Sequence, residues 1–271
     1  MEDFSFAVRL TETVNWSLSE EDFKFIMGLE PDGCFVVLDD SERIGVATTI
    51  SFGRVGWLGN TIVSESHRER GAGSLLVRHS IEHLTNKNVE TIGLYSYIKR
   101  IPFYTKLGFE YDTEFVVLKG KGFPAPTKAC LREAGKDDIQ NIADLDRLCF
   151  GASRRKLLEP ILRYSNNLCY ISIEDERILG FAVAKVYDGL VEVGPLVCRR
   201  ARSDIAIDLL KATLNRLQGF EVSMCIPEKE YTILKMLTKF GFRESFRVAR
   251  MFFGHPIIKE CIYVAESLER G

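Results

Sequence analysis

The two halves of this 271-residue chain repeat one another, and the repeat limits the possible folds more than any other feature. FYTKLGF at residues 103–109 returns as MLTKFGF at residues 236–242, at an offset of 133. Arg68 and Arg202 each lie five positions after a valine, at an offset of 134. Segments that keep nearly the same offset across half a chain indicate duplication of one structural unit. The sequence therefore predicts two copies of one α/β fold.

Helix and strand patterns alternate in the first copy. Ser19 and Asp22 form a capping box ahead of apolar residues at helical spacing. Runs rich in β-forming residues predict strands, and amphipathic runs predict helices. The expected strands are residues 34–38, 44–52, 55–63, 91–97 and 111–118, and the expected helices are residues 71–86 and 100–107.

A linker composition appears near the midpoint of the chain. Residues 119–128 read KGKGFPAPTK, with two glycines, two prolines and three lysines. We expect an N-terminal domain over residues 1–120, a linker over 121–129 and a C-terminal domain over 130–271.

Composition and charge argue against several classes of protein. Lys and Arg total 36 against 38 Asp and Glu, so no basic excess is available for a run of phosphates, and nucleic-acid binding is not expected. The acidic start MEDFSFAVRL predicts no signal peptide, and no apolar stretch approaches the roughly 18 residues of a membrane span. The seven cysteines are scattered without CxxC spacing, which favours free thiols in a reducing compartment, the cytoplasm.

A candidate anion site follows the strand that ends at Val63. HRERGAGS at residues 67–74 leads into a predicted helix, whose first amides are unpaired and carry the positive end of the helix dipole. The two glycines would let a pyrophosphate approach the backbone, and the two arginines can add charged hydrogen bonds. The alternative is an ordinary solvated connection between a strand and a helix. The loop fits neither the dinucleotide GxGxxG pattern nor a Walker loop.

This loop, VSESHRERGAG at residues 63–73, followed by FYTKLGF, resembles the GNAT superfamily of acyl-CoA-dependent N-acetyltransferases. The resemblance covers residues 5–120 well and residues 130–250 more weakly. It implies an α/β fold of two tandem GNAT-like domains, each a mixed, mostly antiparallel splayed sheet flanked by helices. It also implies acetyl-CoA as co-substrate and no metal.

The family pattern implies roles for individual residues. The implied pantetheine contacts are Ile62, Val63 and Ser64, where a backbone amide would also polarise the thioester carbonyl. The implied pyrophosphate contacts are Arg68, Glu69, Arg70, Gly71, Ala72, Gly73 and Ser74. Tyr104 matches the tyrosine that protonates the departing CoA thiolate, although packing on a short helix also explains a tyrosine there.

The general base is harder to assign, because the strand before the loop carries no acid. Glu65, which stands where the family often has proline, is our candidate base, and solvent or a backbone carbonyl relay is the alternative. Trp16 is a candidate contact to the acceptor substrate or, equally, a core tryptophan. His79 and His83 lie four residues apart on a predicted helix, but no third ligand accompanies them, so no metal site is expected.

The second copy loses the residues that carry the chemistry. Ile205 and Ile207 replace the two loop glycines, and Asp204 adds a negative charge that would repel a pyrophosphate. Leu237 stands where the first copy has its tyrosine. The C-terminal domain is therefore expected to be a degenerate GNAT-like domain that shapes the substrate cleft or makes an interface.

These patterns predict an N-acetyltransferase that moves an acetyl group from acetyl-CoA to a primary amine by direct attack. One alternative is a non-enzymatic acetyl-CoA-binding sensor or scaffold, and another is an enzyme that uses a longer acyl-CoA. The acceptor stays open among polyamines, amino acids, aminoglycosides and protein lysines. The oligomeric state also stays open.

Overall fold

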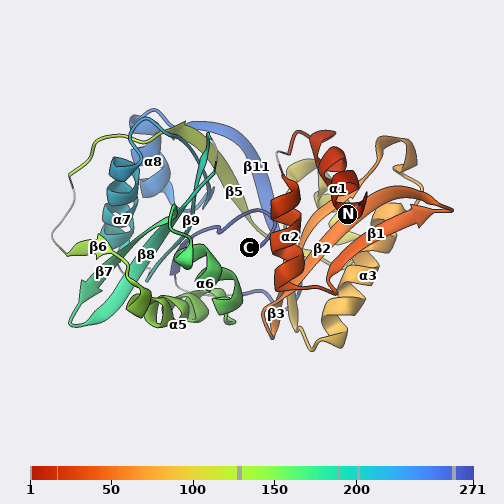
Figure 1. Ribbon diagram of the computed structural model, residues 1–271, viewed down its shortest axis with the longest axis horizontal. Helices are drawn as coiled ribbons and strands as arrows, with labels where there is room; N and C mark the ends of the chain where they lie inside the picture. Colours follow the sequence, from red (N-terminus) through yellow and green to blue (C-terminus); the bar gives the residue numbers. More distant parts are fainter. Residues whose placement is uncertain (1, 17, 127–129, 188, 200–201, 258–260) are drawn as a thin grey trace.

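The computed structural model describes residues 2–16, 18–126, 130–187, 189–199, 202–257 and 261–271. Within these residues, twelve strands form one continuous sheet in the order β1-β2-β3-β4-β11-β5-β10-β9-β8-β7-β6, with β12 paired to β9. Neighbouring strands are antiparallel except for β3 with β4 and β9 with β10. Figure 1 shows the two halves of the chain side by side, with β5 and β11 between them.

The elements of the first half are α1 (Glu2–Glu12), α2 (Glu20–Leu29), β1 (Cys34–Asp39), β2 (Glu42–Ser51), β3 (Val55–Val63), η1 (Glu65–His67), α3 (Ala72–Asn86), β4 (Thr91–Tyr97), η2 (Ile98–Arg100), α4 (Ile101–Thr105) and β5 (Glu110–Lys121). Those of the second half are β6 (Leu131–Glu133), η3 (Lys136–Asp138), α5 (Ile139–Phe150), α6 (Arg155–Arg163), β7 (Leu168–Glu174), β8 (Arg177–Val186), β9 (Val191–Arg199), α7 (Ser203–Arg216), β10 (Glu221–Pro227), α8 (Tyr231–Lys239), β11 (Arg243–Gly254) and β12 (Cys261–Val264).

Most predicted elements of the first half are confirmed. The helix expected at 71–86 is α3, and the strand expected at 91–97 is β4. The capping box starts α2 as predicted, because the Ser19 hydroxyl accepts from the Asp22 amide and the Asp22 carboxylate accepts from the Ser19 amide. β5 continues to Lys121, the first residue of the expected linker, and pairs there with Glu221 of β10.

The two halves exchange their last long strands. β11 of the second half lies between β4 and β5 of the first half, antiparallel to both. β5 of the first half in turn pairs with β10 of the second. The sequence repeat therefore divides the chain at the linker, whereas the sheet runs unbroken through both copies.

Helices cover both faces of the sheet in each half. In the first half, Val46 packs with α1 and α2 on one face, and its neighbour Ala47 packs with α3 on the other. In the second half, Ala182 packs with α7, and Phe181 packs with α5 and α6. This alternation follows from the period of two in a strand. The core on the α5 and α6 face also contains residues of the first half, among them Trp57.

Candidate active site

The sheet of the first half opens between β3 and β4. The parallel pairing of these strands covers only Val55–Thr91, Gly56–Ile92 and Trp57–Gly93, and beyond Trp57 the strands separate. At the opening, Asn60 and Thr61 of β3 stand opposite Ala47 of β2 in a β-bulge, with Asn60 at φ 48°. Backbone groups of β3 at such a splay are available to pair with an extended ligand.

The segment after β3 leads from this opening to the N-terminus of α3. Gly71 is the N-cap residue, in the left-handed conformation at φ 95°, and no side chain caps the helix. The first amides of α3 are therefore open to an anion. Arg68 folds back towards β3, because its Nε donates to the Val63 carbonyl at 3.0 Å.

The two glycines of this loop, Gly71 and Gly73, are explained by different features of the structure. Gly71 is required by its positive φ. A Cβ on Gly73 would lie at an ordinary 3.5 Å from Phe103, so the fold alone leaves room for a side chain there. A glycine at this position leaves the backbone open to close approach by a ligand.

The structure places the residues implied as CoA contacts on one continuous segment. Ile62 is buried beneath α1 and α2, while Val63 and Ser64 are half-buried at the strand end. The Ser64 amide is used internally, since it donates to the Ile44 carbonyl at 2.8 Å. The loop residues are exposed or half-buried: Arg68, Glu69, Arg70, Gly71, Ala72, Gly73 and Ser74.

Tyr104 lies on α4, beside the bulge of β3. Its ring packs edge-on against Phe103 and Phe109, with centroids 5.0 and 5.8 Å apart. Burial raises the pKa of Tyr104 to about 12, against the opposing effect of the nearby Thr61 hydroxyl and the Arg100 charge. The phenol therefore keeps its proton at neutral pH, and its hydroxyl lies beside Thr61 at the bulge.

The other two predicted site residues are Trp16 and Glu65, and both lie near the C-terminal end of β3. Trp16 follows α1, and its Nε1 donates to the Tyr97 hydroxyl at 2.7 Å, which joins the helices on this face to the end of β4. Glu65 is exposed on η1, after the last residue of the strand. The bulge at Asn60 and Thr61 was not predicted from the sequence, although Gly-Asn inside a β-rich run is a signal for a bulge.

The corresponding opening in the second half is filled by the chain itself. β9 and β10 pair in parallel only at Val191–Val222 and Glu192–Ser223 before they separate. β12 lies in this opening, antiparallel to β9 from Cys261–Arg199 to Val264–Leu196, and the Ala265 amide donates to the Cys225 carbonyl of β10 at 3.0 Å. The position where an acyl-CoA arm would pair with the strand is thus already occupied.

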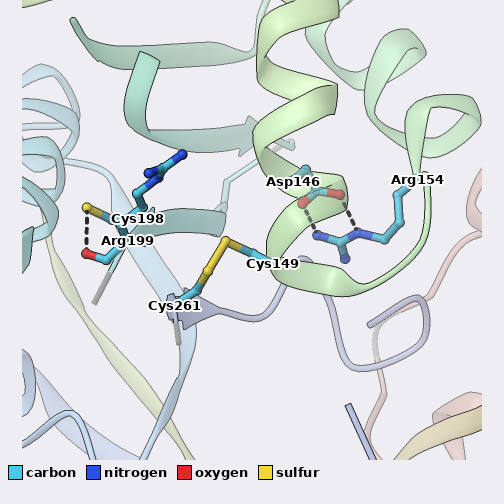
Figure 2. The surroundings of a disulfide bond; sticks show 6 residues. All are labelled: Asp146, Cys149, Arg154, Cys198, Arg199 and Cys261. Carbon is cyan, nitrogen blue, oxygen red and sulfur yellow. Dashed lines mark hydrogen bonds and ion pairs between the residues drawn. A yellow bond between two sulfur atoms is a disulfide. The ribbon is translucent and has the colours of Figure 1, made fainter. Parts of the chain in front are cut away.

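A disulfide and buried ion pairs hold this C-terminal segment, residues 261–271. Figure 2 shows Cys149 of α5 bonded to Cys261 of β12, close to the buried pair of Asp146 and Arg154. The expectation that every cysteine is free is therefore wrong for these two. Spacing could not reveal the bond, because the partners are 112 residues apart. Cysteines 34, 130, 169, 198 and 225 are free.

Further along the segment, Glu266 forms the centre of a buried charge cluster. Lys185 pairs with Glu266 at 2.6 Å and with Glu192 at 2.8 Å. Arg270 pairs with Glu266 at 2.9 Å. Burial opposes the charge on Glu266, but Arg270 and Lys185 outweigh it and hold the pKa of this carboxyl far below its usual range.

The loop of the second half differs from the sequence-based expectation in one respect. Ile205 is 5% exposed and belongs to the core, so its side chain does not stand over the start of α7. Arg202, the counterpart of Arg68, pairs with Glu174 at 2.6 Å and with Asp204 at 3.5 Å. Leu237, the counterpart of Tyr104, is fully buried.

Two comparisons with protein families agree with this geometry. Residues 4–109 match the acetyltransferase (GNAT) family, and residues 142–263 match an acetyltransferase (GNAT) domain. The chain belongs to the GNAT family, with two domains in tandem. It is therefore an acyltransferase of the GNAT type.

The chain is similar to several known proteins. The uncharacterized N-acetyltransferase YitH of Bacillus subtilis is 23% identical over 205 residues, 74% of this chain and 71% of its own. A putative acetyltransferase from Pyrococcus horikoshii superposes with a TM-score of 0.83 at 22% identity, over 100% of this chain and 93% of the other. A tandem GNAT protein from the clavulanic acid biosynthesis pathway has a TM-score of 0.61 at 12% identity, over 87% and 88%. These structures are alike in fold.

The described residues contain neither a membrane-spanning helix nor a cluster of metal ligands. No helix in the described ranges combines the length and apolar character that crossing a membrane requires. Among the residues whose positions are known, no three His, Cys, Asp or Glu side chains gather as a metal site would need. His79 and His83 pack their rings against Phe35, with centroids 4.6 and 5.3 Å away.

Proposed function

We propose that the first GNAT domain transfers an acetyl group from acetyl-CoA to a primary amine. The observation that carries this proposal is the continuity between the opening of β3 and β4 and the uncapped start of α3. An acyl-CoA needs both features, because its pantetheine arm is extended and its pyrophosphate is anionic. Open backbone groups suit the arm, and free helix amides suit the pyrophosphate.

The proposed contacts follow the chain. Ile62, Val63 and Ser64 border the pantetheine arm, and the loop from Arg68 to Ser74 holds the pyrophosphate. A backbone amide near Ile62 and Val63 polarises the thioester carbonyl. The amine nitrogen attacks the carbonyl carbon, the bond from carbon to sulfur breaks, and Tyr104 gives its proton to the departing thiolate. Trp16 borders the acceptor.

The ammonium proton that this attack releases also needs an acceptor. The sequence suggests Glu65, and its exposed position on η1 lets it act only through solvent. The net charge and composition of the chain do not indicate which amine is the acceptor. The proposed compartment is the cytoplasm, which the five free cysteines support and the disulfide does not.

Calorimetric titration of acetyl-CoA tests the binding part of the proposal. We expect one acetyl-CoA per chain, because β12 occupies the second opening. In Gly73→Ile, the Cβ stands at an ordinary van der Waals distance from Phe103, but the branched side chain meets the proposed pyrophosphate. We therefore expect at least about a tenfold loss of affinity, about 1.4 kcal/mol. The melting temperature should hardly change.

Gly28→Ile is the matched control. Gly28 also lies in a helix, and a Cβ there would meet nothing within 4 Å. This variant should bind acetyl-CoA as the wild type does. Two binding events in the wild type would contradict a filled second opening, and no binding at all would overturn the proposed function.

Turnover distinguishes the enzyme from a sensor or scaffold. CoA release is measured with spermidine, lysine, kanamycin and a lysine-containing peptide as acceptors. Acetylation of any of them excludes the sensor, and binding without turnover across the panel favours it. Competition by octanoyl-CoA tests the alternative of a longer acyl donor, since a preference for it would replace acetyl-CoA in the proposal.

A further inference from the structure

The strand that borders the proposed thioester site carries no carboxylate. Between Val55 and Val63 the sequence is VGWLGNTIV, and the next acid, Glu65, lies beyond the strand. An amine is largely protonated at neutral pH, so a group near the opening must take its proton before it can attack. A carboxylate from elsewhere in the fold can do this.

The C-terminal segment brings the backbone of such a residue, Glu269, against β3. A Cβ built on Gly59 would lie 3.0 Å from the Cα of Glu269, and closer still to its carbonyl oxygen. Gly59 is therefore the position where the absence of a side chain lets the segment cross the strand. The bulge residue Asn60 follows at once. Glu269 thus lies against β3 at the start of the opening.

The same segment is seated on the face of the sheet that carries α5 and α6. Gly271 packs against the Trp57 ring, and Trp57 belongs to the core on that face. Leu268 packs against the same hydrophobic cluster as Tyr95 and Tyr97 of β4, the other strand of the opening. Residues 268–271 therefore span from β4 to β3, on the face opposite α3 and the proposed pyrophosphate loop.

The Ser267 hydroxyl and the Glu269 amide hydrogen-bond the Glu269 carboxylate, which makes no ion pair with a described residue. Arg270 and Lys185 both pair with Glu266, so Glu269 has no ion-pair partner in the described part of the chain. Its side chain is half-buried. Burial raises the pKa of Glu269, with a contribution from Glu192 and against the opposing charge of Arg270; the Cys225 thiol of β10 also lies within its electrostatic range.

We propose that Glu269 is the general base of the first domain and binds the acceptor as an ammonium ion. The carboxylate accepts one proton from the ammonium nitrogen, and the freed lone pair then attacks the thioester carbonyl. This inference rests on the proposed function and deepens it. With this role, the C-terminal segment takes part in both openings. β12 fills the opening of the second domain, and Glu269 is the general base at the opening of the first.

Glu269→Gln tests the proposal, because it removes the base and keeps the size of the side chain. With the best amine of the panel, we expect kcat/KM to fall by about a hundredfold or more. Calorimetric affinity for acetyl-CoA should stay within about twofold of the wild type. The acidic limb of the pH profile of kcat/KM, which reports ionisation of the base in the free enzyme, should disappear.

Two further variants separate a base from a structural residue. Glu269→Asp keeps the charge and should restore part of the activity lost in Glu269→Gln, with the acidic limb present. Equal losses in both variants together with a lower melting temperature would indicate a structural role and overturn the proposal. Glu65→Gln is measured beside them as the rival base.

The outcomes remain distinguishable from failure of the proposed function. Wild-type turnover in Glu269→Gln, or loss of the acidic limb in Glu65→Gln instead, overturns the assignment of Glu269 alone. If the wild type acetylates no amine of the panel, the proposed function fails, and the role of Glu269 fails with it.

Discussion

In the proposed function, Tyr104 serves both packing and chemistry. Its ring is part of the core beneath α4, and its hydroxyl lies near Thr61 of the bulge. Since burial raises its pKa to about 12, the phenol stays protonated through the whole range in which an amine becomes a nucleophile. At this position the second domain has Leu237, which keeps only the packing role.

Tyr104→Phe should therefore separate the two roles. The ring contacts are kept, so the melting temperature and the affinity for acetyl-CoA should hardly change. We expect kcat to fall by about a hundredfold, because the thiolate must then leave without a positioned proton donor. With the pKa at about 12, the wild type should lose no activity through this residue up to about pH 10. Unchanged kcat would contradict the role of Tyr104.

At the residue scale, the sequence predicts best where the backbone demands a particular residue type. Gly71 was expected where a strand leads into a helix, and the structure makes it the N-cap of α3 at a positive φ. Glu269 could not be found in this way. A single glutamate far along the chain has no local pattern, and only the folded sheet brings it to Gly59.

Among the elements, the end of α2 is the point where several parts of the fold meet. Glu30, its C-cap residue, accepts from the Ser51 amide of β2 at 2.9 Å and from Lys156 of α6 at 3.0 Å, and it also pairs with Lys87 after α3. Its side chain is 5% exposed. Burial alone would raise the pKa of Glu30, but these partners outweigh it and lower the pKa to about 2.

This shift predicts a pH dependence of stability. A carboxyl whose pKa is lowered in the folded state stabilises the protein above its unfolded value of 4.5, and this contribution is lost as the pH falls through about 2. Glu30→Gln should lower the free energy of unfolding by about 1–3 kcal/mol at neutral pH. Urea unfolding at pH 7 and pH 3 should show the difference from the wild type shrink by about half. A constant difference would contradict this account.

Elements with a strong local pattern were predicted within a residue or two, as α3 and β4 show. β12 was not predicted. Its four residues carry no signal beyond a short β-rich run, and it is a strand only because the opening between β9 and β10 supplies unpaired backbone. Such an element depends on tertiary context rather than on sequence pattern.

For the whole molecule, the exchange of β5 and β11 couples the two sequence repeats. Neither copy completes its own sheet, because β4 requires β11 and β10 requires β5. The repeat in the sequence predicted two domains of one fold, and the family matches agree. It could not predict the exchange, since both copies of the final strand have the same pattern and suit the same neighbours.

We therefore expect the chain to unfold in one cooperative transition. Both tryptophans, Trp16 and Trp57, belong to the first half, whereas the far-ultraviolet circular dichroism signal reports helices and strands of both halves. Urea unfolding curves from tryptophan fluorescence and from circular dichroism should coincide. Separate midpoints would mean that the two halves unfold independently despite the shared strands.

The exchanged strands also have an evolutionary consequence. Two identical subunits that swap their last strand form a symmetric dimer, and every mutation then appears in both active sites. Fusion of such a pair into one chain removes that constraint. A segment of the chain can then fill the opening of one domain, while the other domain keeps its loop and its tyrosine. The domain with the filled opening can contribute side chains to the site of the other domain.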